Sequence, residues 1–192
     1  MCSWCWAFKP TWHKVKEALL DQVEIDYLLG GLAPDSNEPM PIKTREYVKG
    51  NWKRIQKMIP DTRFNYDFWT SCEPKRSTYP ACRAVICAKL QHPDFENLMI
   101  FGIQKSYYLE AQNPSNENVL INIAKKLGLD IDKFIIDFKS SHVNEILLDE
   151  IKLARSMGIN SMPSLALKVN GTLKGINIDY LDANYIVKQI IP

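Results

Sequence analysis

The stretch CSWCWAF, residues 2–8, decides how the rest of this chain is interpreted. Two residues separate Cys2 from Cys5, so a helix that begins here places one thiol at its start and the other one turn further in. The apolar side chains that follow recur at helical spacing, at Phe8, Trp12, Val15 and Leu19. Residues 23–27 (VEIDY) then alternate with period two, which predicts a strand. A cysteine pair thus starts an amphipathic helix that leads into a predicted strand.

The placement of the two cysteines suits thiol–disulfide chemistry. Unpaired N–H groups at a helix start stabilise negative charge, so the Cys2 thiol should ionise readily while Cys5 waits one turn deeper to attack it. Two other interpretations stay open. A CxxC is also half of a tetrahedral zinc site, for which Cys82 and Cys87 would be the second pair. In the other interpretation, Cys2 and Cys5 are two buried or incidental cysteines without a chemical function.

Composition and charge exclude several classes of function. Hydrophobic residues make up 46% and charged residues 24% of the 192 residues, enough for a core without disulfides. The net charge is +2 without a basic run, so we expect no nucleic-acid partner. No stretch is apolar for long enough to span a membrane, and only Met1 precedes Cys2, so we expect no signal peptide. Five cysteines, an odd count, predict free thiols in a reducing, cytoplasmic compartment.

The rest of the pattern predicts a helical middle and a β-hairpin near the end. Helices are expected over residues 44–59, 78–90, 95 to a stop near Asn113-Pro114, 115–127, 132–139 and 143–154, and residues 64–69 form an extended piece or a packed loop. Asn170-Gly171, between predicted strands at 164–169 and 172–178, is the strongest short hairpin signal that a sequence offers. A closing helix begins near Asp182.

The order of these elements leads to a family resemblance. A CxxC helix, the distant Met162-Pro163 pair at the entry to a hairpin and a closing helix form the layout of the thioredoxin fold. The chain resembles the DsbA-like thioredoxin-fold thiol–disulfide oxidoreductases, and most closely their FrnE-like branch. The matching stretches are CSWCWAF (2–8), LLGGLAPDS (28–36), FNYDFW (64–69), RSTYPACRAV (76–85), NPS (113–115) and SMPSLAL (161–167).

The resemblance implies an α/β fold in which a large all-helical domain interrupts a thioredoxin-like domain. Residues 1–42 and 140–192 would form the thioredoxin-like domain, and residues 43–139 the helical insertion. The fold's first strand should precede the CxxC motif, and here only one residue does. We therefore expect a strand to be missing from the sheet, with a longer natural protein or a homodimer as the ways to fill its place.

The resemblance also implies a role for each site residue. Cys2 would be the nucleophile and Cys5 the resolving thiol in disulfide exchange with protein substrates, with glutathione as an alternative co-substrate. Trp4 and Trp6 would shape the apolar rim, with core packing as the alternative for both, and Met162 and Pro163, joined by a cis bond, would line the substrate groove. No metal and no cofactor beyond the redox disulfide is expected. A glutathione-dependent isomerase or transferase of the same fold, and a zinc-binding or chaperone-like module, are the alternative functions.

A second cysteine pair lies on a predicted helix. Cys82 and Cys87 are five residues apart, which turns their side chains ~140° away from each other and disfavours a disulfide between them. Cys82 follows Pro80 in the first turn, where a thiolate is favoured, so we expect it to be more reactive than Cys87. They are either accessory redox thiols or apolar core residues.

Overall fold

The computed structural model describes residues 1–20 and 22–191. In chain order, its elements are α1 (Ser3–Ala18), α2 (Ile42–Met58), α3 (Phe68–Ser71), α4 (Tyr79–Gln91), α5 (Asp94–Tyr108), α6 (Glu117–Lys126), α7 (Ile131–Lys139), α8 (Ser141–Ser156), β1 (Leu165–Val169), β2 (Thr172–Ile176) and α9 (Ala183–Ile190). No helix within this described part is both long and apolar enough to cross a membrane.

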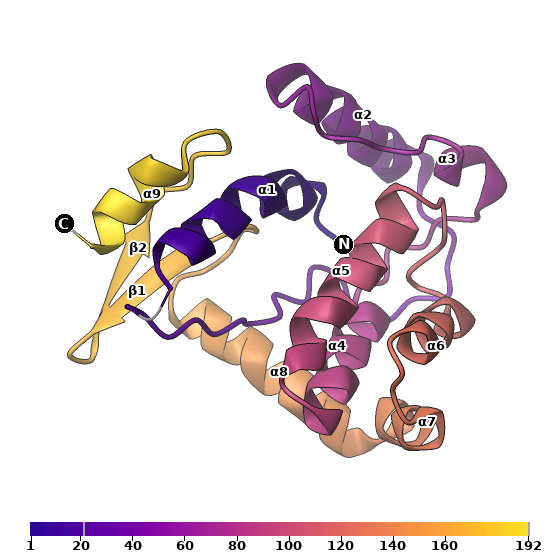
Figure 1. Cartoon of the computed structure of the whole chain (residues 1–192). Helices are drawn as coiled ribbons and strands as arrows, with labels where there is room; N and C mark the ends of the chain where they lie inside the picture. The colour runs from indigo at the N-terminus through magenta and orange to yellow at the C-terminus, as the bar shows by residue number, and fades with distance from the viewer. Residues whose placement is uncertain (21, 192) are drawn as a thin grey trace.

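Two groups of elements make up the molecule. Figure 1 shows the hairpin of β1 and β2 on one side with α9 and α1, and the bundle of α4 to α8 on the other, with α2 and α3 above the bundle. Helix α1 packs against both α9 and α2. Its N-terminal end is directed toward the bundle, so the cysteine motif lies where the two groups meet (Figure 1).

Local sequence signals explain where several helices begin. Helix α4 carries a proline in its first turn, where a missing N–H costs no helical bond. The side chains of Asp130, Ser140 and Asp182 accept hydrogen bonds from backbone N–H groups at the starts of α7, α8 and α9. Each predicted helix is present, with bounds within a few residues of those expected. The one unexpected helix is the single turn α3, within the segment expected to be extended or a packed loop.

The hairpin agrees with its sequence signal. Strands β1 and β2 pair antiparallel, with Leu165 opposite Ile176 and Val169 opposite Thr172. Asn170 and Gly171 both have positive φ, 49° and 81°, as a two-residue type I′ turn requires. The side chain of Ile176 is buried against α1 and α9, which anchors this small sheet to the helix that carries the cysteines.

The predicted strand at residues 23–27 is wrong. The residues that the structure describes form one sheet of only two strands, and this segment is in neither. A strand needs a neighbour to pair its backbone groups. Side chains hold this part of the chain instead: the Tyr27 hydroxyl accepts a 2.9 Å hydrogen bond from Trp12 Nε1, and the Glu150 carboxylate of α8 accepts a 2.8 Å hydrogen bond from the Leu29 N–H just after the segment. The sheet of the described residues therefore consists of the hairpin strands β1 and β2 alone.

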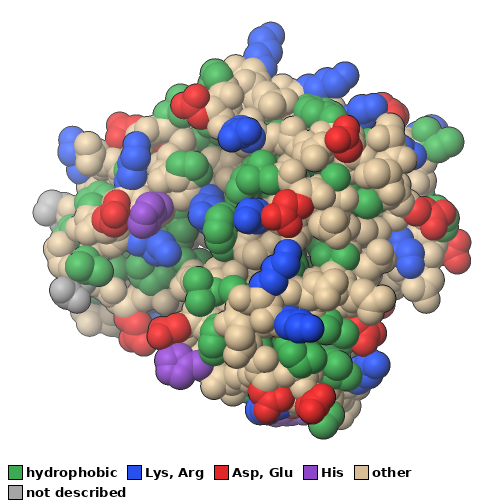
Figure 2. Space-filling view, turned by 45° about the vertical axis from the view of Figure 1, so that its right-hand side comes forward, with side chains coloured by type: hydrophobic (Ala, Val, Ile, Leu, Met, Phe, Trp, Pro, Cys, Tyr) green, Lys and Arg blue, Asp and Glu red, His purple; other side chains and the backbone are tan. Residues whose placement is uncertain are grey.

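Three main clusters of side chains fill the interior. One joins α4 to α8 and includes Cys87, and a second joins α1, the hairpin and α9. The third is aromatic, and its buried members are Trp52, Phe68, Trp69, Tyr107 and Tyr108. On the surface, Figure 2 shows basic, acidic and hydrophobic side chains interspersed over the visible face, without a large patch of one charge. The division into domains at residues 42 and 140 stays a prediction.

Candidate active site

The two cysteines of the motif occupy the start of α1. Cys2 is the N-cap residue with an extended backbone (φ −101°, ψ 118°), and Cys5 lies within the first turn of the helix. No side chain caps this helix end, which leaves its first N–H groups free for the Cys2 sulfur. Both cysteines are free thiols of intermediate exposure. The structure therefore brings the motif into the arrangement that the spacing predicts.

The surroundings drive the pKa values of the two thiols apart. The Cys5 S–H donates a hydrogen bond to the Cys2 sulfur, and together with backbone N–H groups of Cys5 and Trp4 it lowers the pKa of Cys2 to about 6. The same hydrogen bond, and then burial, raises the pKa of Cys5 well above its usual value. One sulfur is thus an anion at neutral pH while its neighbour holds a proton, which is the asymmetry of a nucleophile and its resolving thiol.

The loop before β1 lies directly over Cys2. In its protonated form the Cys2 Sγ donates a 3.1 Å hydrogen bond to the backbone oxygen of Met162. The Met162–Pro163 peptide bond is cis, the isomer expected from the sequence. Gly30 lies against the other side of this loop, where an added Cβ would overlap the end of the Met162 side chain. The Met162 backbone therefore borders the same sulfur that the electrostatics make nucleophilic.

The two tryptophans of the motif have different surroundings. Trp4 is partly exposed and contacts the edge of Tyr180, with ring centroids 5.3 Å apart. Trp6 instead stacks on the buried Tyr108 at 5.6 Å, and its Nε1 donates to the Arg63 backbone oxygen. The rim role of Trp4 stays a prediction, whereas Trp6 belongs to the aromatic core, so core packing and not a rim position describes Trp6.

Cys82 and Cys87 are not part of the thiol pair. Burial raises the pKa of both, that of Cys87 to about 12, so the expectation that the helix start lowers the pKa of Cys82 is wrong. Cys82 is the fourth residue of α4, and there the loss of solvation on burial raises the pKa of the thiol by more than the helix N-terminus lowers it. Within the described residues, no group of three or more His, Cys, Asp or Glu side chains is placed to hold a metal ion. The proposed zinc set of Cys2, Cys5, Cys82 and Cys87 is therefore not assembled.

Sequence reasoning missed two residues at the site. Tyr180, in the loop after β2, packs its ring on Trp4 and Phe8, and burial followed by the nearby Cys2 and Cys5 raises its pKa to about 12. No periodicity marks a loop tyrosine 175 residues from the motif's end, so no signal could have found it. Gly30 carried a signal, since a Gly-Gly pair indicates close backbone approach.

Comparison with curated proteins finds related chains. The chain is 24% identical over 168 residues to the ClpXP adapter protein SpxH of Halalkalibacterium halodurans, covering 85% of this chain and 54% of that protein. It is 25% identical over 169 residues to the protein of the same name from Shouchella clausii, covering 85% and 53%. The chain thus spans about half the length of the curated relatives it matches.

Solved structures share the fold over almost the whole chain. A proposed protein disulfide isomerase from Nitrosomonas europaea superposes with a TM-score of 0.84 at 21% identity, covering 98% of this chain and 90% of that one. The cytosolic disulfide reductase DsbM from Pseudomonas aeruginosa gives 0.76 at 20% identity, covering 98% and 88%. These likenesses confirm the thioredoxin-like fold with its large helical part.

A family model completes the assignment. The Thioredoxin_5 model, described as thioredoxin, matches residues 1–189. Because it covers nearly the whole sequence, the chain belongs to this thioredoxin family, and the resemblance to the DsbA-like thioredoxin-fold thiol–disulfide oxidoreductases is confirmed.

Proposed function

We propose that the protein is a thiol–disulfide oxidoreductase that exchanges disulfides with protein substrates through Cys2 and Cys5. The observation that carries this proposal is the contact between the two sulfurs at the start of α1, with the pKa of Cys2 lowered to about 6 and that of Cys5 raised. A pair with equal thiols would lack a preferred attacking sulfur. This pair has one, and it is the outer sulfur.

The exchange follows from that asymmetry. The Cys2 thiolate attacks one sulfur of a substrate disulfide, and the other substrate sulfur leaves as a thiolate and takes up a proton. Cys5 then loses its proton and attacks Cys2 Sγ, which releases the second substrate sulfur and leaves the Cys2–Cys5 disulfide. The substrate is reduced by two electrons and the protein is oxidised by two. The reverse sequence oxidises a substrate dithiol.

The loop at residues 161–164 would guide the substrate. The Met162 oxygen is 3.1 Å from Cys2 Sγ, so a chain that delivers its sulfur to Cys2 must pass beside the Met162 and Pro163 backbone. Extended chains bind such exposed backbone as an added strand would. Trp4, within the motif, and Tyr180, whose ring contacts Trp4, supply an apolar surface beside the cysteines. Cys82 and Cys87, with raised pKa values, take no part in the exchange.

A pair of variants tests the proposal. Cys2→Ser should abolish the reduction of insulin disulfides, because no other thiol lies at a helix start with a lowered pKa. Cys5→Ser should keep the first attack and accumulate protein–substrate mixed disulfides, since the resolving thiol is gone. Cys72→Ser, in a loop outside the motif, is the matched control and should retain activity. Full insulin reduction by Cys2→Ser would contradict the proposal.

The setting of the reaction is part of the proposal. Five unpaired thiols suit a reducing compartment, so we propose a cytoplasmic protein that works with protein thiols, with glutathione as a reductant and with no further cofactor. DsbM, one of the proteins of like fold, is called a cytosolic disulfide reductase and has also been solved with glutathione, which supports this choice.

A second candidate function rests on the curated relatives. Proteins named ClpXP adapter protein SpxH match 85% of this chain, which favours a role in binding another protein without redox turnover. The two candidates differ in their need for the Cys2 sulfur. A protein-binding role should survive Cys2→Ser in a pull-down from cell extract, whereas mixed disulfides should disappear with it.

A further inference from the structure

A cavity adjoins the cysteine motif on the bundle side. Its volume is about 80 Å³, several times the ~10–15 Å³ that one water molecule needs. Met1 lines it, and the Cα atoms of Met1 and Cys2 are only ~3.8 Å apart along the chain. The remaining walls come from residues 32–33, 40, 48, 68, 75–78, 107 and 113–115. Three sequence stretches quoted for the family resemblance, LLGGLAPDS, RSTYPACRAV and NPS, therefore meet here without a role in the exchange reaction itself.

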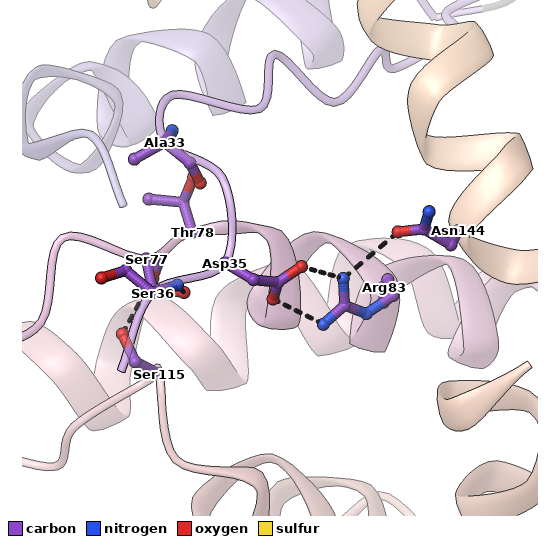
Figure 3. Close-up of polar contacts among 8 residues, drawn as sticks. All are labelled: Ala33, Asp35, Ser36, Ser77, Thr78, Arg83, Ser115 and Asn144. Carbon is purple, nitrogen blue, oxygen red and sulfur yellow. Dashed lines mark hydrogen bonds and ion pairs between the residues drawn. The ribbon is translucent and has the colours of Figure 1, made fainter. Parts of the chain in front are cut away.

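The walls of the cavity are firmly built. Thr78 Oγ1 both accepts from the Ala33 N–H at 2.9 Å and donates to the Ala33 oxygen at 3.0 Å. Ser115 Oγ donates to the Ser77 backbone oxygen at 2.8 Å, and Ser77 Oγ accepts from the Ser36 N–H. Figure 3 shows these residues gathered from the 33–36 loop, the start of α4 and the segment before α6. The hydroxyl groups are thus used to fix the walls, and a ligand must be held by other groups.

The fixed charge at the cavity is positive. Lys75 and Arg76 are among its lining residues, and none of the lining residues is an aspartate or a glutamate. Among the described residues, neither cation forms an ion pair with a carboxylate. Asp35, the acidic residue of the neighbouring loop, is instead held by Arg83 through two bonds of 2.7 and 2.8 Å (Figure 3). Arg83 therefore neutralises Asp35, and the carboxylate of Glu73, which lies with Lys75 on a second, neighbouring cavity, forms no ion pair with either cation among the described residues.

We propose that this cavity binds a carboxylate of a small acidic thiol, such as glutathione, whose sulfur exchanges with Cys2. The inference rests on the proposed function and names the substrate class of the same site. A guanidinium and an ammonium recognise a carboxylate by charge-assisted hydrogen bonds, and the apolar wall of Met1, Met40 and Val48 keeps the water-exposed area small. The cavity thus selects among thiols by their charge.

The reaction balances with the thiol as the only reductant. The thiolate of one acidic thiol attacks Cys2 Sγ of the Cys2–Cys5 disulfide, and Cys5 leaves as a thiolate that takes up a proton, as its raised pKa favours. The thiolate of a second acidic thiol then attacks the sulfur of the first one in its mixed disulfide with Cys2. It releases the Cys2 thiolate and forms the disulfide of the small thiol. Two thiols are oxidised, and one protein disulfide is reduced by two electrons.

The first test compares thiols that differ in carboxylates. The oxidised protein is reduced by glutathione, by its diethyl ester and by dithiothreitol, and the loss of the Cys2–Cys5 disulfide is followed by the fluorescence of the adjacent tryptophans. Glutathione should react about tenfold faster than the ester with wild type, at equal thiolate concentration. K75Q/R76Q should remove that preference and leave the dithiothreitol rate unchanged. K53Q/R54Q, a neighbouring Lys–Arg pair on exposed α2 positions, is the matched control and should keep the preference.

A second test does not depend on redox activity. S-methylglutathione has no free thiol, and titration calorimetry should show it binding to wild type and to K53Q/R54Q, with about tenfold weaker binding to K75Q/R76Q. Equal rates for glutathione and its ester in wild type, or unchanged binding by K75Q/R76Q, would overturn the carboxylate site. A disulfide that dithiothreitol cannot reduce, or that never forms, would instead overturn the proposed function and leave the calorimetric result to decide the cavity.

Discussion

Removal of the Cys5 thiol should raise the pKa of Cys2 by a calculable amount. A hydrogen bond from the Cys5 S–H is the largest cause that lowers the pKa of Cys2 to about 6. A hydrogen bond to a charged group contributes ~1.5–3 kcal/mol, and one pKa unit corresponds to ~1.36 kcal/mol. Cys5→Ala should therefore raise the pKa of Cys2 by about 1–2 units, to about 7–8. At pH 7 the thiolate fraction of Cys2 should fall from about 90% to about 10–50%.

The rate of Cys2 alkylation reports this pKa. Reduced protein is treated with limiting iodoacetamide over a range of pH, and the Cys2 peptide is quantified by mass spectrometry. Its rate should be half-maximal near pH 6 in wild type and between about pH 7 and 8 in Cys5→Ala. Cys5→Ser, which keeps a hydroxyl donor, should lie between them. In the control variant Cys72→Ala, the midpoint for Cys2 alkylation should equal that of wild type. A wild-type midpoint near the ~8.5 of free cysteine would refute the reasoning, as would an unchanged midpoint in Cys5→Ala.

Three further predictions follow from other contacts. Gly31→Ala should lower the free energy of unfolding by about 2–4 kcal/mol in urea denaturation, because Gly31 has φ 49° and a Cβ there would overlap Ile151 Cδ1. Gly128→Ala, with φ 80° and open space around it, should cost only about 1 kcal/mol, and equal losses would contradict the packing argument. The Cys82 thiol should be alkylated faster than Cys87 in native protein, since Cys87 is fully buried, and equal protection would remove the distinction. The pKa of Cys2 is lower in the folded protein than in the unfolded chain, so ionisation of Cys2 stabilises the folded state. This stabilisation is complete above pH ~8.5 and is lost as the pH falls through about 6. The stability of reduced wild type relative to Cys2→Ser should therefore rise with pH across this window in urea titrations, and a flat difference would contradict the lowered pKa.

Local sequence signals determined most of the helices and the hairpin. The start of α7 could be predicted because Asp130 accepts from the Lys133 N–H only three residues away, and the hairpin because Asn170 and Gly171 tolerate positive φ. The same locality explains the failure at residues 23–27. Alternation of side chains describes a surface that suits a sheet, whereas a strand exists only when a distant segment pairs with it.

The candidate site could be predicted in part. The roles proposed for Cys2 and Cys5 follow from two residues of spacing at a helix start, but the Cys2–Met162 contact joins residues 160 apart and no periodicity encodes it. The burial of each cysteine could not be predicted from the sequence either. Position in the first turn suggested a reactive Cys82, and only the packing around it reveals the desolvation that raises its pKa.

The redox equilibrium of the cysteine pair tests the central claim most directly. Protein is equilibrated with glutathione buffers of graded potential, the free thiols are trapped by alkylation, and the mass of each cysteine peptide is measured. We predict one two-electron transition in which Cys2 and Cys5 change together. It should disappear in Cys2→Ser and in Cys5→Ser and persist in Cys82→Ser. Two thiols that remain reduced across the whole range, or a transition that survives loss of Cys2, would contradict the account.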